Sequence, residues 1–180
     1  MSGAATRALY APKAARNGGV TRPLWAPWRL DYIRRAGEQD GCVFCAEATG
    51  QLTAEDSLVV HRGEHVFALL NRFPYTSGHV MVAPYRHVGE LGDLGEPETV
   101  ELHRLTVGAL EALCAIYAPE GYNVGWNLGA VAGGSITGHL HEHVVPRWSG
   151  DTNFMPVLAD VKVMPEHLLE TRDKLRAAWP

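Results

Sequence analysis

A short segment, GHLHEHVVPRW at residues 138–148, places a histidine at every second position: His139, His141 and His143. Successive side chains of a β-strand point to opposite faces, so a strand here would align three imidazoles on one face, about 6–7 Å apart. Buried imidazoles require hydrogen bonds or a metal ion. The segment therefore predicts a catalytic face or a metal-binding face rather than ordinary core.

The chain has 180 residues, enough for one domain with a sizeable core. Its formal net charge of −4 does not suggest the basic surface of a nucleic-acid-binding protein. No apolar run approaches the roughly 20 residues that span a bilayer, and the first residues lack the apolar core of a secretory signal. Three cysteines, an odd number, are untypical of a disulfide scaffold. We expect a cytoplasmic protein that binds neither nucleic acid polymers nor membranes.

The order of the expected elements favours an α+β fold with an antiparallel five-stranded sheet. Residues 1–23, which are rich in Ala, Gly and Arg, are expected to form a disordered tail, and residues 24–180 a single domain. Apolar residues three or four positions apart predict one long helix over residues 97–117, and a C-terminal helix is expected over 164–179. The strands are expected over residues 56–62, 65–71, 79–84, 121–129 and 138–148.

The histidines suit nucleophilic attack on phosphorus. A neutral imidazole can attack when one ring nitrogen holds the proton and the other keeps its lone pair. Just before the histidines lies the glycine-rich loop AVAGGS, where Gly133 and Gly134 would let backbone N–H groups approach a phosphate. Ser135 adds a hydroxyl and Asn127 an amide. A plain turn between two strands would have the same composition, so the loop alone does not decide the function.

The segment HLHEHVV resembles the signature of the histidine triad (HIT) family, in which histidines alternate with mostly apolar residues. Residues 68–88, ALLNRFPYTSGHVMVAPYRHV, resemble that family's N-terminal nucleotide-binding half. LWAPWRLDYI, GYNVGWNLG and PRWSGDTNFMPV are similar to its actinobacterial Ap4A phosphorylase and hydrolase branch. Together these segments lie within residues 24–160. The resemblance implies the HIT-like fold and a homodimer or a larger assembly.

The resemblance also implies a role for each matched residue. His141 would be the nucleophile that forms a nucleotidyl-histidine intermediate, in a step that needs no metal. His139 would orient the site, and His143 would contact phosphate or assist the leaving group. Asn71 would hold the ribose hydroxyls. The phosphate-contacting positions would be Asn127, Gly133, Gly134 and Ser135.

Two positions depart from the family pattern. Glu142 stands where the family usually has an apolar or aromatic residue, and we expect it to point away from the histidine face, towards solvent or another subunit. Ser135 stands where many members carry glutamine. The shorter side chain would leave room for a second anion, which favours phosphate over water as the acceptor.

We therefore expect phosphorolysis of diadenosine tetraphosphate (Ap4A) to ADP and ATP through an adenylyl-histidine, with magnesium arriving on the substrate. The alternative within enzymes is hydrolysis, with water as acceptor, of a dinucleoside polyphosphate or a nucleoside phosphoramidate. An alternative of another class is a nucleotide-sensing binding module.

A second group of residues suits zinc. Cys42 and Cys45 form a C-x-x-C pair, and with His87 and His139 they would offer two thiolates and two imidazoles. Such a pair can also be a redox pair or two small buried residues. Some bacterial members of the family carry zinc with this pattern. Its role would be structural: it would clamp the N-terminal segment against the active strand and fix His139.

Overall fold

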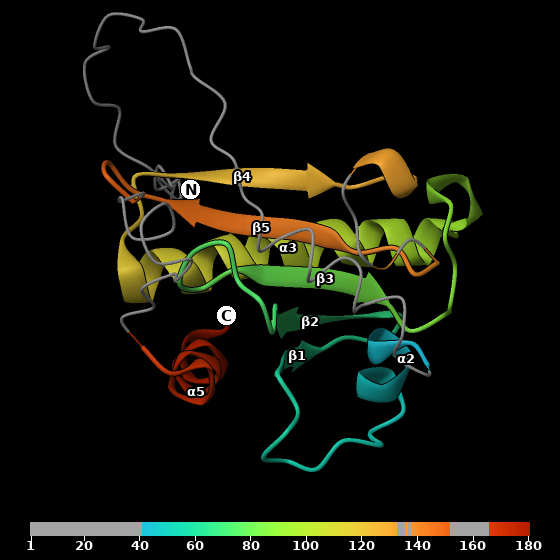
Figure 1. The fold of residues 1–180 in the computed structure, drawn as a ribbon, viewed down its shortest axis with the longest axis horizontal. Coiled ribbons are helices and arrows are strands. Elements are labelled where there is room, and N and C mark those ends of the chain that lie inside the picture. The colour runs from blue at the N-terminus through green and yellow to red at the C-terminus, as the bar shows by residue number, and fades with distance from the viewer. Residues whose placement is uncertain (1–40, 133–135, 137, 152–165) are drawn as a thin grey trace, which may run out of the picture.

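The computed structural model describes residues 41–132, 136, 138–151 and 166–180, and the expected tail at 1–23 lies outside them. A five-stranded antiparallel sheet with the order β1-β2-β3-β5-β4 forms the centre of the fold (Figure 1). This confirms the predicted α+β class. The strands are β1 (Val59–Arg62), β2 (Val66–Leu70), β3 (Val80–Pro84), β4 (Gly121–Trp126) and β5 (Glu142–Arg147). The helices are α2 (Val43–Ala48), α3 (Glu96–Tyr117) and α5 (Leu168–Ala178), with 3-10 turns at Leu91–Asp93 and Ala130–Ala132.

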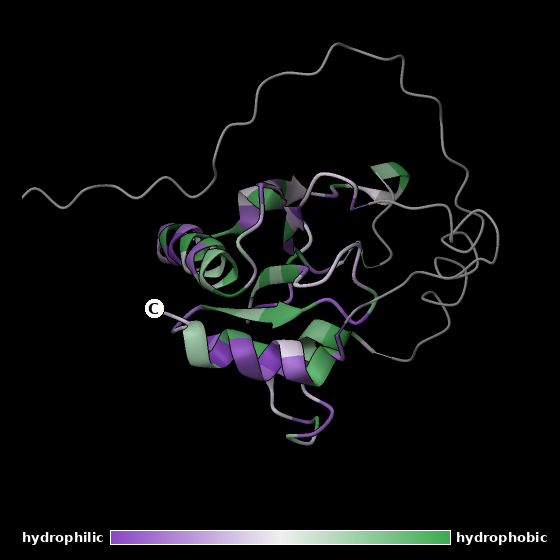
Figure 2. Cartoon of the chain, turned by 90° about the vertical axis from the view of Figure 1, so that its left-hand side faces the viewer, coloured by the Kyte–Doolittle hydropathy of each residue, from purple (hydrophilic) through white to green (hydrophobic). Residues whose placement is uncertain are grey.

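One core fills the space between the sheet and the helices α3 and α5 (Figure 1). Both helices bury one side only, and Figure 2 shows hydrophilic and hydrophobic residues side by side on them. A second, smaller core lies on the opposite face of the sheet, beneath α2, and contains Phe44, Phe67 and Met81. Because alternate residues of a strand face opposite sides, β2 is buried along its whole length. No helix of the described part of the chain is long and apolar enough to cross a membrane.

The last strand is shorter than its sequence predicts. β5 begins at Glu142, so His139 and His141 precede it and only His143 lies within it. The register pairs Val82 with Glu142, which would place Pro84 opposite Leu140 in a longer ladder. Proline has no N–H to donate, and the Leu140 N–H instead bonds the carbonyl of Val88 at 2.7 Å.

Glu142 points away from the histidines, as expected, and it is half-buried against helix α3. Its Oε2 lies 2.5 Å from the hydroxyl of Thr106 on α3. Side chains two positions apart in a strand share a face, and Val144 is part of the core beneath α3. Glu142 therefore lies on the helix-covered face of the sheet.

A carboxylate of α3 holds the turn between β1 and β2. Glu101 accepts hydrogen bonds from the backbone N–H groups of Glu64, His65 and Val66, at 2.8, 2.5 and 3.0 Å. Burial would raise the pKa of Glu101, but the three backbone donors more than offset it, and the pKa lies below its usual value. The ionised side chain thus joins the sheet edge to the long helix.

Replacing Glu101 by glutamine should lower the free energy of unfolding by about 2 kcal/mol at neutral pH, because the charged acceptor of three donors is lost. A lowered pKa in the folded state stabilises the fold above the unfolded-state value of about 4.3, and this contribution disappears as the pH falls through the folded-state value. The free energies of urea unfolding of the wild type and the variant should therefore converge as the pH falls from about 4.3 through the folded-state pKa. Glu111→Gln, at an exposed position of α3, is the control. A difference that does not change with pH would contradict this role.

Candidate active site and metal site

The three histidines of the 138–148 segment gather on the sheet face opposite α3. All are buried, with His139 1% exposed and the other two 9%. The ring centroids of His141 and His143 lie 4.9 Å apart with their planes at 76°. The rings of His139 and His141 both pack against Phe44, at 5.1 and 4.7 Å between centroids. The predicted clustering of the imidazoles on one side of the sheet is therefore found, although two of them lie before the strand.

The ring of His141 has a defined tautomer. Its Nδ1 lies 2.8 Å from the main-chain carbonyl oxygen of His139. A carbonyl can only accept, so Nδ1 carries the proton and Nε2 keeps its lone pair. Burial lowers the pKa of His141, and the hydrogen bond to the carbonyl offsets this only in part. The neutral ring with an unprotonated Nε2 is the form that a nucleophile needs.

The ring of His143 has the opposite tautomer, which is set by His79. The backbone N–H of Tyr75 donates to Nδ1 of His79 at 3.1 Å, so the proton of the neutral His79 ring is on Nε2. That Nε2 lies 3.0 Å from Nδ1 of His143 and donates to it. Nε2 of His143 then carries a proton. The Asn127 amide nitrogen Nδ2 lies 3.1 Å from it, and since both are donors, a half-turn of the amide that brings Oδ1 to this place lets Asn127 accept that proton. The site thus pairs an acceptor nitrogen on His141 with a donor nitrogen on His143.

His79 is fully buried, and its hydrogen bonds confirm the role of structural hydrogen bonder that its place after Gly78 and the family resemblance predict; its partners could not be read from the sequence. The one local signal is the preceding Gly78, which has a φ of +74°. A Cβ on Gly78 would lie 2.7 Å from a side-chain carbon of Leu113 on α3. Glycine therefore lets the chain turn tightly against α3 and then enter β3 with His79 directed into the site.

Of the predicted nucleotide-binding residues, the structure describes two. Asn127 lies beside His143, as given above. Asn71 follows β2: its Oδ1 accepts from the N–H of Phe73 at 2.9 Å, and its Nδ2 lies 3.4 Å from Nδ1 of His79. Its backbone N–H bonds the carbonyl of His79 at 2.9 Å. Gly133, Gly134 and Ser135 lie outside the described residues.

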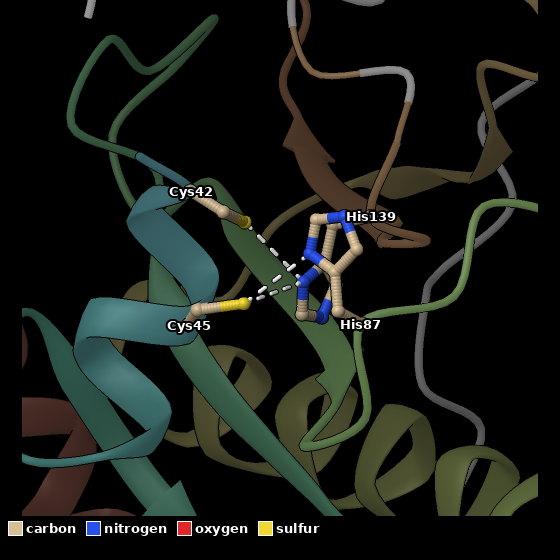
Figure 3. A group of neighbouring side chains, drawn as sticks. All are labelled: Cys42, Cys45, His87 and His139. Atoms are coloured by element: carbon tan, nitrogen blue, oxygen red, sulfur yellow. Dashed lines mark hydrogen bonds between the residues drawn. The ribbon is translucent and has the colours of Figure 1, made fainter. Parts of the chain in front are cut away.

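The predicted metal ligands Cys42, Cys45, His87 and His139 come together, with all four ligand atoms within 4.8 Å of one another (Figure 3). The Sγ of Cys42 lies 3.3 Å from Nδ1 of His139, and the Sγ of Cys45 lies 3.2 Å from Nδ1 of His87 and 3.6 Å from that of His139. Zinc at about 2.3 Å from sulfur and 2.0 Å from nitrogen in a tetrahedron would separate such atoms by about 3.5 Å. The donor set and its spacing fit zinc.

The surroundings also suit a cation. Nε2 of His139 lies 2.9 Å from the carbonyl of Pro84, which fixes the proton on Nε2 and leaves Nδ1 free to bind a metal. Burial lowers the pKa of His139, so the ring is neutral, as a ligand must be. Burial and the neighbouring Cys42 raise the pKa of the Cys45 thiol. Two adjacent thiolates here would therefore need a cation to stabilise them.

The comparisons with known proteins identify the family. The sequence model of the HIT domain matches residues 53–150. The chain belongs to the HIT family. An AP-4-A phosphorylase of Mycobacterium tuberculosis is 44% identical over 162 residues, which cover 87% of this chain and 83% of that protein. This agrees with the resemblance to the actinobacterial branch of the family.

Solved HIT structures share the fold. A zinc-bound histidine triad family protein from Mycobacterium smegmatis is 27% identical, with a TM-score of 0.62, and the match covers 77% of this chain and 92% of that one. A histidine triad nucleotide-binding protein from Sulfolobus tokodaii is 23% identical, with a TM-score of 0.62 over 76% of this chain and 91% of that one, and it supports the fold alone.

Proposed function

We propose that this HIT protein cleaves Ap4A by phosphorolysis, with His141 as the nucleophile. The observation that carries the proposal is the hydrogen bond of His141 Nδ1 to the carbonyl of residue 139, which leaves Nε2 able to attack. The choice of substrate and acceptor follows the Mycobacterium tuberculosis relative, which is named an AP-4-A phosphorylase.

The reaction proceeds in two displacements. Nε2 of His141 attacks the α-phosphorus of one adenosine, an N–P bond forms, and the P–O bond to the remaining polyphosphate breaks, releasing ATP. The Nε2–H of His143 donates to the departing or non-bridging oxygen. An oxygen of inorganic phosphate then attacks the adenylyl phosphorus, the N–P bond breaks, and ADP leaves. With water as the acceptor, the second product would be AMP.

The remaining binding roles belong to the same proposal. Asn71 holds the ribose hydroxyls, and Asn127, Gly133, Gly134 and Ser135 contact the phosphates. His139 orients the site. Magnesium arrives with the polyphosphate, and the chemical step itself needs no metal.

We also propose a structural zinc ion held by Cys42, Cys45, His87 and His139. This is supported by the donor spacing of about 3.2–3.6 Å between sulfur and nitrogen. The ion would fix helix α2 and His139 against the sheet.

The assembly we propose is a homodimer in the cytoplasm. β4 is an edge strand of the sheet, and its Val124 is 46% exposed. An exposed edge with an apolar residue favours pairing with a second copy, either directly or through the adjoining helix.

The acceptor is tested with Ap4A and 32P-labelled orthophosphate. Phosphorolysis predicts that the label appears in ADP and that ATP is unlabelled, because the acceptor phosphate becomes the β-phosphate of ADP. Unlabelled AMP with ATP would instead establish hydrolysis. Tight Ap4A binding without products would favour the nucleotide-sensing module.

The nucleophile is tested in the same assay. His141→Ala should lower kcat by roughly 1,000-fold or more, since the proposed nucleophile is removed. His103→Ala removes an exposed imidazole of α3 and should leave kcat near that of the wild type. Comparable loss in both variants would exclude a specific role for His141.

Zinc is tested by metal analysis of protein purified without chelator. The wild type should contain about one zinc ion per chain, and Cys45→Ser should lower this to well below one half, because one of four ligands is lost. Cys114→Ser, which removes the cysteine of α3, should retain the metal. Wild-type protein with little zinc would contradict the assignment.

A further inference from the structure

The six-residue helix α2 connects the metal site to the nucleophile through a single aromatic ring. Cys42 is its N-cap and Cys45 lies in its first turn, so Phe44 sits between the two proposed metal ligands. Phe44 is 1% exposed, and its side chain enters the core beneath the sheet rather than solvent.

The ring of Phe44 stacks on the ring of His141, with centroids 4.7 Å apart and the planes at 28°. The same ring lies 5.1 Å from His139 at 38°. The hydrogen bond from His141 Nδ1 to the main-chain carbonyl of residue 139 fixes the Nδ1 edge of the imidazole against the backbone. It leaves the plane of the imidazole less constrained, because one hydrogen bond permits rotation about its own axis. Stacking on a flat ring removes that freedom.

A helix this short is not stable by itself, and α2 has no side-chain hydrogen bond at its N-cap. Its C-terminal half is fixed by Glu47, 2% exposed, which accepts from the Ser57 hydroxyl at 2.7 Å and the Leu58 N–H at 3.0 Å. Its N-terminal half, which carries Phe44, is fixed by the contacts of the two cysteines with His87 and His139.

We propose that Phe44 is a positioning residue for the nucleophile, and that the metal site acts on catalysis through it. The inference rests on the proposed role of His141. The cysteine–histidine cluster holds the first turn of α2 in place, the first turn holds the ring of Phe44, and that ring holds the imidazole plane of His141. Nε2 is then directed along one line of attack.

The first experiment compares Phe44→Leu with Phe67→Leu. Phe67 is fully buried in the same core cluster, so the control matches the loss of aromatic volume without the contact to His141. Single-turnover formation of the adenylyl-histidine should slow roughly 10- to 100-fold in Phe44→Leu, with KM within about threefold of the wild type, because misaligned reactants lose rate more than binding. Phe67→Leu should keep the wild-type rate.

Equal rates of adenylyl-histidine formation in Phe44→Leu and the wild type would overturn the proposal. Should Phe44→Leu not fold, Phe44→Met, which better preserves the side-chain volume, replaces it.

The second experiment removes zinc with a chelator from the wild type and from Phe44→Leu. If the metal acts through Phe44, its removal slows the wild type to about the rate of the zinc-loaded variant and slows the variant little further, so the two effects are not additive. If the losses of rate from zinc removal and from Phe44→Leu were additive, the metal would act independently of Phe44, and the proposed coupling between the metal site and His141 would be overturned.

A third readout does not depend on turnover. In NMR spectra of the zinc-loaded wild type, ring protons of Phe44 and His141 should show mutual nuclear Overhauser effects, which weaken on zinc removal and persist in Phe67→Leu. Their absence in the zinc-loaded wild type would refute the stacking. If the stacking is seen but the wild type never forms an adenylyl-histidine, the proposed function fails while the contact itself stands.

Discussion

The site depends on one hydrogen bond, between Nδ1 of His141 and the main-chain carbonyl of His139. It decides which nitrogen of the His141 ring keeps its lone pair. The carbonyl is in turn held in place because the His139 side chain is fixed at both ring nitrogens, by Pro84 on one side and the cysteine pair on the other.

The fold supplies this arrangement by covering the two faces of the sheet differently. The face towards α3 and α5 carries the large core, which fixes the strands. The other face carries a smaller core beneath α2, and the histidines are gathered there. His79, immediately before β3, completes the set, because the β3–β5 pairing brings it beside His143. Two histidines thereby receive opposite tautomers, with a lone pair on Nε2 of His141 and a proton on Nε2 of His143.

Alternation along residues 138–148 predicted that three imidazoles share one side of the sheet. The C-x-x-C pair left a redox pair or two buried residues open, and only with the distant His87 and His139, and with the family resemblance, did it predict the four residues that the structure brings together. The sequence did not reveal that Pro84 interrupts the ladder, because this depends on the register between β3 and β5. The contacts of Glu142 with Thr106 and of Phe44 with His141 were also missed. Both join segments that are distant in the sequence, and spacing along the chain carries information only about near neighbours.

The central claim is that Nε2 of His141 carries a free lone pair in the folded protein. Long-range proton–nitrogen NMR correlations of the imidazole rings test it directly, with His141→Asn used to assign the signals. We expect a neutral His141 ring with its proton on Nδ1, and a His143 ring with its proton on Nε2. A proton on Nε2 of His141, in protein that forms products from Ap4A, would contradict the account.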